Sequence, residues 1–262
     1  SSPEANIRKS IRLTAQMASA TAACYRLKAG RELINPNPRL GHAANFLYML
    51  TGQRPNQNHV RAFDIALILH ADHELNASTF SARVTAATLS DLHSAVTSAI
   101  GTLKGPLHGG ANQDVMNLLL EIGEVDKAAE AVREMLTNKE KIPGFGHRVY
   151  KTEDPRATHL RRLSKELGED AGDIKWYDMS RIIEQTMMDE KNIASNVDFY
   201  SATVYNGMKI PIELYTPIFA CSRISGWTAH LLEQYEDNRL IRPTGSYTGK
   251  TNLTYIPLED RK

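Results

Sequence analysis

Helical periodicity along almost the whole chain is the feature that most limits its possible folds. Apolar residues recur at spacings of three and four, and few runs alternate between apolar and polar residues as strands would. Asp154 and Pro155 are residue types typical of an N-cap and a first helical position, and Gly168 is typical of a helix stop. The pattern therefore predicts an all-α fold that includes a helix ending at Gly168.

Further helices are expected on both sides of that one, separated by segments rich in glycine or proline. The expected helices cover residues 3–29, 58–73, 79–89, 92–103, 126–138 and 179–190, and a long helix opens at Thr216 and ends before Asp237. The expected irregular segments are residues 105–110, 142–154 and 168–174. The polar tail after Arg242 is expected to lie on a surface or on a partner.

The composition is that of a folded globular chain with no strong charge bias. Hydrophobic residues make up 42% of it, and 31 Lys and Arg against 30 Asp and Glu give a net charge of +1. No overall basic field exists to attract nucleic acid or anionic lipid, so neither a nucleic acid nor a membrane is a predicted partner. Cys24 and Cys221 are far apart, which favours reduced thiols and a cytoplasmic location.

The first candidate site residue is His108, which lies between Leu107 and two glycines, just before an apolar run that resembles a helix start. At a helix start, free backbone N–H groups disfavour a charged imidazole, so His108 could stay neutral and donate one hydrogen bond. A histidine flanked by glycine can equally well shape a loop. This segment alone leaves both interpretations open.

Two other segments carry polar groups in unusual settings. Gly144 and Gly146 let the backbone approach a ligand closely just before His147, although a surface turn is the alternative. Asp198 lies among apolar residues, where burial would raise its pKa toward the range of a general base. A helix N-cap is the alternative for Asp198.

His70 and His73 lie one helical turn apart with acidic residues nearby, which suggests a metal site at first sight. The zincin pattern requires a spacing of four rather than three, so one buried and one ligand-binding histidine is the favoured interpretation. Arg223 and Arg242 could each bind a carboxylate with two hydrogen bonds, or be surface charges. The histidines without supporting neighbours are expected to be structural or exposed: His42, His59, His93, His159 and His230.

Taken together, these segments resemble the citrate synthase family. Residues 105–112, residues 144–147 followed by 154–156, and residues 196–198 occur in the order typical of that family, and the resemblance spans most of the chain. It implies three catalytic residues. Asp198 would remove a proton from the acyl-CoA methyl group, His108 would hydrogen-bond the thioester oxygen, and His147 would hydrogen-bond or protonate the oxaloacetate carbonyl.

The resemblance also implies how the substrates are held. Oxaloacetate would be bound by His73, Arg156, Arg223 and Arg242, with Arg242 contributed by the second subunit of a homodimer. The coenzyme A thioester is a co-substrate, and neither a metal nor a permanently bound cofactor is expected. The coenzyme A loop would comprise Lys141, Ile142, Pro143, Gly144, Phe145, Gly146 and Lys151.

The family fold implies two helical domains. A large domain would contain residues 1–109 and 210–262, and a small domain of residues 110–209 would be inserted between them and close over the ligands. Family members usually possess a further N-terminal portion. We therefore expect a processed or truncated chain, or a missing piece supplied by another chain.

The function implied is that of a citrate synthase, which condenses acetyl-CoA with oxaloacetate and hydrolyses citryl-CoA to citrate and coenzyme A in the tricarboxylic acid cycle. A 2-methylcitrate synthase would use the same residues with propionyl-CoA, and the extra methylene changes binding by only ~1–3 kcal/mol. Residues 73–76 and 151–156 favour the citrate-forming members. Two functions of a different kind stay open, a non-catalytic helical scaffold and a metallohydrolase built on His70 and His73.

Overall fold

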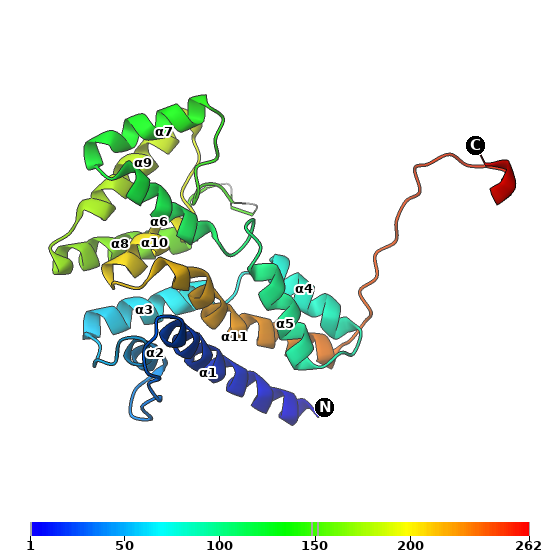
Figure 1. Ribbon diagram of the computed structural model, residues 1–262, viewed down its shortest axis with the longest axis horizontal. Coiled ribbons are helices and arrows are strands. Elements are labelled where there is room, and N and C mark those ends of the chain that lie inside the picture. The colour runs from blue at the N-terminus through cyan, green and yellow to red at the C-terminus, as the bar shows by residue number, and fades with distance from the viewer. Residues whose placement is uncertain (1, 148, 151, 262) are drawn as a thin grey trace.

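The computed structural model describes residues 2–147, 149–150 and 152–261, and these form an all-α protein, as predicted (Figure 1). Short 3-10 turns occur at Val125–Lys127, Ile212–Leu214 and Leu258–Asp260, and Phe145 and Ser195 form an isolated antiparallel bridge. The α-helices are α1 (Pro3–Lys28), α2 (His42–Thr51), α3 (Gln57–His70), α4 (Ala77–Ala87), α5 (Leu92–Leu103), α6 (Ala111–Ile122), α7 (Ala128–Thr137), α8 (Pro155–Ala171), α9 (Lys175–Lys191), α10 (Val197–Gly207) and α11 (Tyr215–Glu236).

The prediction that α8 ends at Gly168 is wrong. The helix continues to Ala171 and ends at Gly172, which has a left-handed φ of +66°. Gly168 is buried within the helix, and a Cβ there would lie 3.2 Å from the Ile174 Cα. Gly168 is therefore a packing position, whereas Gly172 provides the left-handed backbone that terminates the helix.

The helix expected over residues 58–73 ends three residues early, at His70. Residues 71–76 form instead a connector to α4, and its close approach to α11 explains the break. A Cβ on Gly226 would lie 2.2 Å from the Ala71 carbonyl oxygen, so only glycine allows the two backbones to meet. His73 consequently lies on a connector and not on a helix.

Two helices, α2 and α10, are not expected from the sequence. All the residues from Phe199 to Tyr205 in α10 are buried, so this helix has no polar face and no amphipathic period by which to recognise it. Helix α2 has Gly41 as its N-cap residue, which provides no side-chain hydrogen bond. Both helices are therefore stabilised by tertiary packing rather than by local signals.

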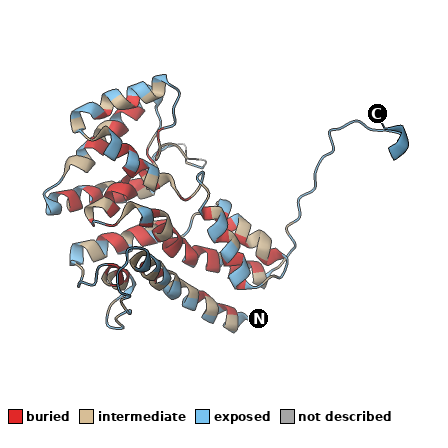
Figure 2. Cartoon of the chain, in the orientation of Figure 1, coloured by how far each residue is buried: buried red, intermediate tan, exposed pale blue. Residues whose placement is uncertain are grey.

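The buried residues lie mainly where the helices face one another (Figure 2). They form two hydrophobic clusters, and α11 contributes to both. One cluster joins α1 to α3 with α6 to α10, and the other joins α4 and α5 to α11. After α11 the chain extends away from the helices as a tail of mostly exposed residues (Figure 1). Within the described part of the chain, no helix combines the length and apolar character needed to cross a membrane.

Candidate active site

His108 lies on the short connector between α5 and α6, which is tightly packed. The Gly109 N–H donates to the Leu103 carbonyl (3.0 Å), and a Cβ on Gly109 would lie 2.4 Å from that oxygen. The Thr216 hydroxyl at the start of α11 donates to the Gly109 carbonyl (3.0 Å). These contacts fix the backbone that carries His108.

The contacts of the His108 ring define which nitrogen carries the proton. The Ser78 backbone N–H donates to His108 Nε2 (3.2 Å), and the Ser78 hydroxyl lies 2.8 Å from the same nitrogen. A backbone N–H can only donate, so Nε2 is an acceptor and the neutral ring carries its proton on Nδ1. Burial, and then the charge of Arg223, lowers the pKa of His108 to about 4. At neutral pH the ring is therefore uncharged, and burial and Arg223, rather than the helix start considered from the sequence, are the cause.

His147 is a second imidazole, and it has the opposite tautomer. The backbone N–H groups of Val149 and Tyr150 donate to His147 Nδ1 (3.0 and 3.1 Å), which leaves the proton on Nε2. Burial, followed by the neighbouring His73 and Arg156, lowers the pKa of His147. The neutral ring therefore donates through Nε2.

His73 lies on the connector between α3 and α4 and faces His147. The centroid of its ring lies 4.9 Å from that of His147 and 5.5 Å from that of Tyr150. Its Nε2 is buried and has no hydrogen-bond partner in the described part of the chain, so a ligand that bonds to this nitrogen would satisfy it. His70, in contrast, is fully buried, with Nδ1 2.8 Å from the Ala66 carbonyl. The expectation of one buried histidine in this pair is confirmed.

Arg156 is held in the first turn of α8 by Asp154, the N-cap residue of the same helix. The Asp154 carboxylate accepts from Arg156 Nε (3.0 Å) and Nη2 (2.8 Å), and also from the Val197 backbone N–H (3.1 Å). Burial by itself raises the pKa of Asp154, but the hydrogen bond and charge of Arg156 outweigh burial and lower it. One buried carboxylate therefore ties Arg156 to the start of α10, where Asp198 lies.

Asp198 is the second residue of α10, and its side chain does not cap the helix. Asn196 is the cap, because its Oδ1 accepts from the Asp198 backbone N–H (3.0 Å). Asp198 Oδ1 is buried and has no hydrogen-bond partner among the residues that the structure describes. Burial raises the pKa of Asp198 to about 6, against the lowering effect of Arg156 and Arg223. The N-cap alternative is therefore wrong, and the carboxylate has an increased basicity.

Arg223 is a buried cation on α11, so the surface alternative for it is wrong. The residue is 2% exposed, its Nε donates to the His70 carbonyl (2.7 Å), and its guanidinium lies 4.8 Å from the centroid of the Phe219 ring. Burial, followed by repulsion from Arg156, lowers the pKa of Arg223 to about 10, so it is still charged at neutral pH. Within the described residues it forms no ion pair, and a buried unpaired charge favours a bound anion.

The residues described above form what we call the central polar cluster. The charge of Arg156, of Arg223 or of both contributes to the pKa shifts of His73, His108, His147 and Asp198, and the charge of Arg156 to that of Arg223. The members are His73, His108, His147, Arg156, Asp198 and Arg223. The structure thus gathers the predicted catalytic and oxaloacetate-binding residues, with the exception of Arg242. It places two neutral donors, one basic carboxylate and two cations in one region.

Arg242 does not lie near the central polar cluster of its own chain. It is exposed and belongs to the tail that follows α11, which leads away from the helices (Figure 1). Its predicted role requires a second subunit, and that role stays a prediction.

The turn expected to bind coenzyme A is paired to the segment that precedes α10. The Asn196 N–H donates to the Gly144 carbonyl (2.9 Å), and the Gly146 N–H donates to the Ala194 carbonyl (3.0 Å). Gly144 has a φ of +80°, and a Cβ on it would lie 2.8 Å from Val115 Cγ2. Glycine is therefore required at this position by both the backbone conformation and the packing.

The side chains of this turn face different surroundings. Ile142 is buried in the hydrophobic core, and the Phe145 ring lies 4.6 Å from that of Phe199. Lys141 is exposed, whereas Lys151 lies outside the described residues. Coenzyme A binding by this turn stays a prediction.

Sequence reasoning missed Ser78 and Trp227, which position His108. Trp227 Nε1 donates to Ser78 Oγ (3.0 Å), so the single hydroxyl proton of Ser78 can point to His108 Nε2 (2.8 Å), while Asn76 Oδ1 accepts from the Thr79 backbone N–H (3.2 Å). An asparagine cap followed by serine marks the start of α4 and could have been noticed as a local signal. No local signal relates Trp227 to Ser78, because 149 residues separate them.

Comparison with known proteins relates this arrangement to one family. Residues 1–244 match the family described as the citrate synthase C-terminal domain. The chain belongs to the citrate synthase family. It is therefore an acyltransferase of the citrate synthase type.

Individual members of the citrate synthase family support this assignment. Citrate synthase 2 of Bacillus subtilis is 57% identical over 259 residues, which are 99% of this chain and 70% of that relative. A 2-methylcitrate synthase of Shewanella oneidensis is 47% identical over 218 residues, or 83% of this chain and 58% of that relative. The ternary complex of citrate synthase from Thermoplasma acidophilum with carboxymethyl coenzyme A and oxaloacetate has a TM-score of 0.89 and 32% identity, covering 98% of this chain and 70% of that one.

Proposed function

We propose that the central polar cluster condenses an acyl-CoA thioester with oxaloacetate, and that Asp198 is the base. The observation that carries this proposal is the buried, unpaired Oδ1 of Asp198, on a carboxyl whose pKa of about 6 suits a base at neutral pH. The neutral His108 and His147 supply the hydrogen-bond donors that the reaction needs. The Thermoplasma acidophilum relative, in complex with carboxymethyl coenzyme A and oxaloacetate, supports both substrate classes.

In the first step, the Asp198 carboxylate takes a proton from the methyl group of acetyl-CoA. The electron pair of the broken C–H bond moves into a carbon–carbon double bond, and negative charge develops on the thioester oxygen. His108 Nδ1–H donates to that oxygen, because its Nε2 is occupied by Ser78. An uncharged donor suits this task because it stabilises the enolate and need not lose its proton.

In the second step, the enolate carbon attacks the ketone carbon of oxaloacetate. His147 Nε2–H donates to the ketone oxygen, which takes up a proton and becomes the hydroxyl of citryl-CoA. The ketone oxygen takes this proton from His147 Nε2, and the proton that Asp198 removed from the methyl group replaces it. Water then cleaves the thioester to give citrate and coenzyme A. In the hydrolysis the OH of water joins the acyl carbon, the remaining hydrogen goes to the coenzyme A thiol, and ionisation of the new carboxyl group releases one proton to solvent.

Oxaloacetate is a dianion, and the cluster supplies cationic and hydrogen-bonding groups for it. The proposed ligands are Arg156, Arg223 and the unpaired Nε2 of His73. Arg242 of the partner subunit in a homodimer completes the set. Since Arg156 already pairs with Asp154, Arg223 is the cation with the greater need for an anionic partner.

Coenzyme A is proposed to bind at residues 141–146 and Lys151. The two-domain division into residues 110–209 and the remainder is part of the same proposal, and closure of the smaller domain would exclude water from the enolate. The two free cysteines, one exposed and one buried, fit a cytoplasmic location, where thiols stay reduced.

A 2-methylcitrate synthase is the second candidate, because a relative of that name shares 47% identity with this chain. The two activities differ by one methylene of the acyl group, so pocket shape decides between them. The sequence of residues 73–76 favours acetyl-CoA as the preferred substrate.

The proposal is tested by measuring the release of free thiol from acetyl-CoA and from propionyl-CoA, each with and without oxaloacetate. We expect release that requires oxaloacetate and is faster with acetyl-CoA. Asp198→Asn is expected to lower the rate at least about a hundredfold, whereas the control Asp114→Asn, at an exposed position in α6, is expected to leave it unchanged. Faster release from propionyl-CoA would favour the 2-methylcitrate activity, and no release from either thioester would contradict the proposal.

A further inference from the structure

One face of α11 carries side chains that reach the central polar cluster or the connectors leading to it. These residues are Arg223, Trp227, His230 and Gln234. They follow one another at spacings of four, three and four, which places them on the same side of the helix. Arg223 belongs to the cluster and Trp227 supports His108 through Ser78, which leaves the role of His230 to be explained.

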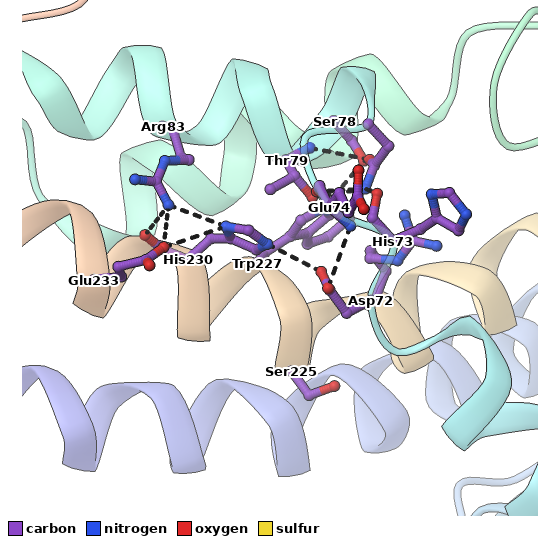
Figure 3. A network of polar contacts seen from close by, with 12 residues as sticks. Asp72, His73, Glu74, Ser78, Thr79, Arg83, Ser225, Trp227, His230 and Glu233 are labelled. Atoms are coloured by element: carbon purple, nitrogen blue, oxygen red, sulfur yellow. Dashed lines mark hydrogen bonds and ion pairs between the residues drawn. The ribbon is translucent and has the colours of Figure 1, made fainter. Parts of the chain in front are cut away.

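His230 bonds to the connector that carries His73 (Figure 3). Arg83 Nη1 lies 3.0 Å from His230 Nδ1, and an arginine can only donate, so Nδ1 is an acceptor. The ring proton is therefore on Nε2, which lies 3.1 Å from Asp72 Oδ1 and donates to it. His230 was expected to be structural or exposed, but it is only 18% exposed and makes a defined contact next to the site.

The contact of Asp72 with His230 fixes the backbone on both sides of His73. The other oxygen of Asp72, Oδ2, accepts from the Glu74 backbone N–H (3.3 Å). Glu74 has a φ of +48°, a left-handed conformation that a non-glycine residue adopts only when its surroundings hold it there. His73 thus lies between an anchored carboxylate and a held turn.

Arg83 fixes the orientation of His230 from the opposite side. Its Nη1 donates to Glu233 Oε2 (2.5 Å) and its Nε to Gln234 Oε1 (3.0 Å), so the guanidinium is tied to α11 by two side chains (Figure 3). The order of contacts is therefore Arg83 to His230, His230 to Asp72, and Asp72 to the turn at His73. Each link is a hydrogen bond between groups of complementary type.

We propose that His230 is a positioning residue that acts through Asp72 to hold His73 in the orientation that binds the keto acid. The inference rests on the proposed function, in which His73 binds oxaloacetate. His230 is not among the proposed ligands of either substrate and bonds to the connector of His73 and to Arg83, so its loss is expected to weaken oxaloacetate binding through His73 and to leave the binding of acyl-CoA unchanged. Losing one hydrogen bond to a charged group is expected to weaken oxaloacetate binding roughly tenfold.

The test compares His230→Leu with His230→Gln, whose side-chain amide can still donate to Asp72. For His230→Leu we expect KM for oxaloacetate and its dissociation constant, measured by calorimetry, to rise about tenfold, with kcat and KM for acetyl-CoA within about twofold of wild type. For His230→Gln we expect recovery of most of the oxaloacetate affinity. The double variant Asp72→Ala with His230→Leu is expected to bind oxaloacetate no more weakly than Asp72→Ala alone, because Asp72→Ala already breaks the link to His230 as well as the one to the Glu74 N–H.

The matched control is His93→Leu, which breaks a histidine–aspartate pair at the exposed start of α5, where His93 Nδ1 lies 3.7 Å from Asp91 Oδ1. It is expected to leave oxaloacetate binding unchanged. A His230→Leu protein that binds oxaloacetate like wild type, or whose loss of affinity equally affects acetyl-CoA, overturns the inference. The proposed function is tested separately by His73→Ala: if wild type binds no oxaloacetate, or His73→Ala binds it equally well, that proposal fails instead.

Discussion

Replacing Asp198 by asparagine is expected to abolish turnover and to make the folded protein more stable at neutral pH. Oδ1 of Asp198 is buried and unpaired, and burial raises the pKa from 3.8 to about 6. Since one pKa unit corresponds to about 1.36 kcal/mol, ionising Asp198 destabilises the folded state by about 3 kcal/mol relative to the unfolded state. Asparagine has no charge and removes most of this penalty.

The sign of the pH dependence follows from the direction of the pKa shift. The folded state has the higher pKa, so between pH 3.8 and about 6 it binds more protons than the unfolded state, and stability falls as the pH rises through this window. The penalty is complete above about pH 6 and absent below about pH 4. The advantage of Asp198→Asn over wild type is therefore expected to be largest at neutral pH and to disappear in acid.

Thermal unfolding followed by circular dichroism at about pH 7 and about pH 5 measures this difference. For a chain of this size, about 3 kcal/mol corresponds to an increase in Tm of roughly 6–10 °C at neutral pH. The control Asp114→Asn, at an exposed position, is expected to show no such pH-dependent gain. If Asp198→Asn is less stable than wild type at pH 7, or gains the same amount at every pH, the assignment of Asp198 as a buried base of raised pKa is refuted.

Two further predictions concern the frame around the site. Gly144→Ala is expected to lower the free energy of unfolding by about 2–5 kcal/mol, because Gly144 has a φ of +80° and the new Cβ would lie 2.8 Å from Val115 Cγ2. Gly172→Ala is expected to lower it by only about 1–2 kcal/mol, because Gly172 has a φ of +66° but open space around it. Urea unfolding compares the two variants. Glu184→Ala is expected to lower the free energy of unfolding by about 3–5 kcal/mol, because it removes a carboxylate that is only 9% exposed and leaves the arginines bonded to it without that partner. Glu166→Ala breaks an exposed ion pair and is expected to cost under about 1 kcal/mol. Equal losses for the two members of either comparison would contradict the packing or burial on which it rests.

The sequence predicted the helical class and the bounds of α5 because both depend on local patterns. It identified His108, His147 and Asp198 as candidates, but it left the use of Asp198 open between a cap and a base. The structure rules out the cap, since Asn196 provides it, and the role of base stays a proposal. The role of Gly168 was predicted wrongly for a related reason: a glycine can end a helix or allow close packing, and only the neighbours of the folded chain distinguish the two.

Spacing and residue type by themselves determined that this chain forms helices, because helix formation depends on neighbours three and four residues apart. The polar motifs gave a resemblance to the citrate synthase family, which the comparison with known proteins then showed. Only the tertiary structure decided the protonation and orientation of the groups at the site. Ser78, 30 residues away, sets the tautomer of His108. His230 bonds to Asp72, on the connector of His73, across 158 residues of sequence. The first contact joins α4 to the connector before α6, and the second joins α11 to the connector after α3. Burial of Asp198 where α10 packs against α8 and α6 raises its pKa, and burial lowers the pKa of His108.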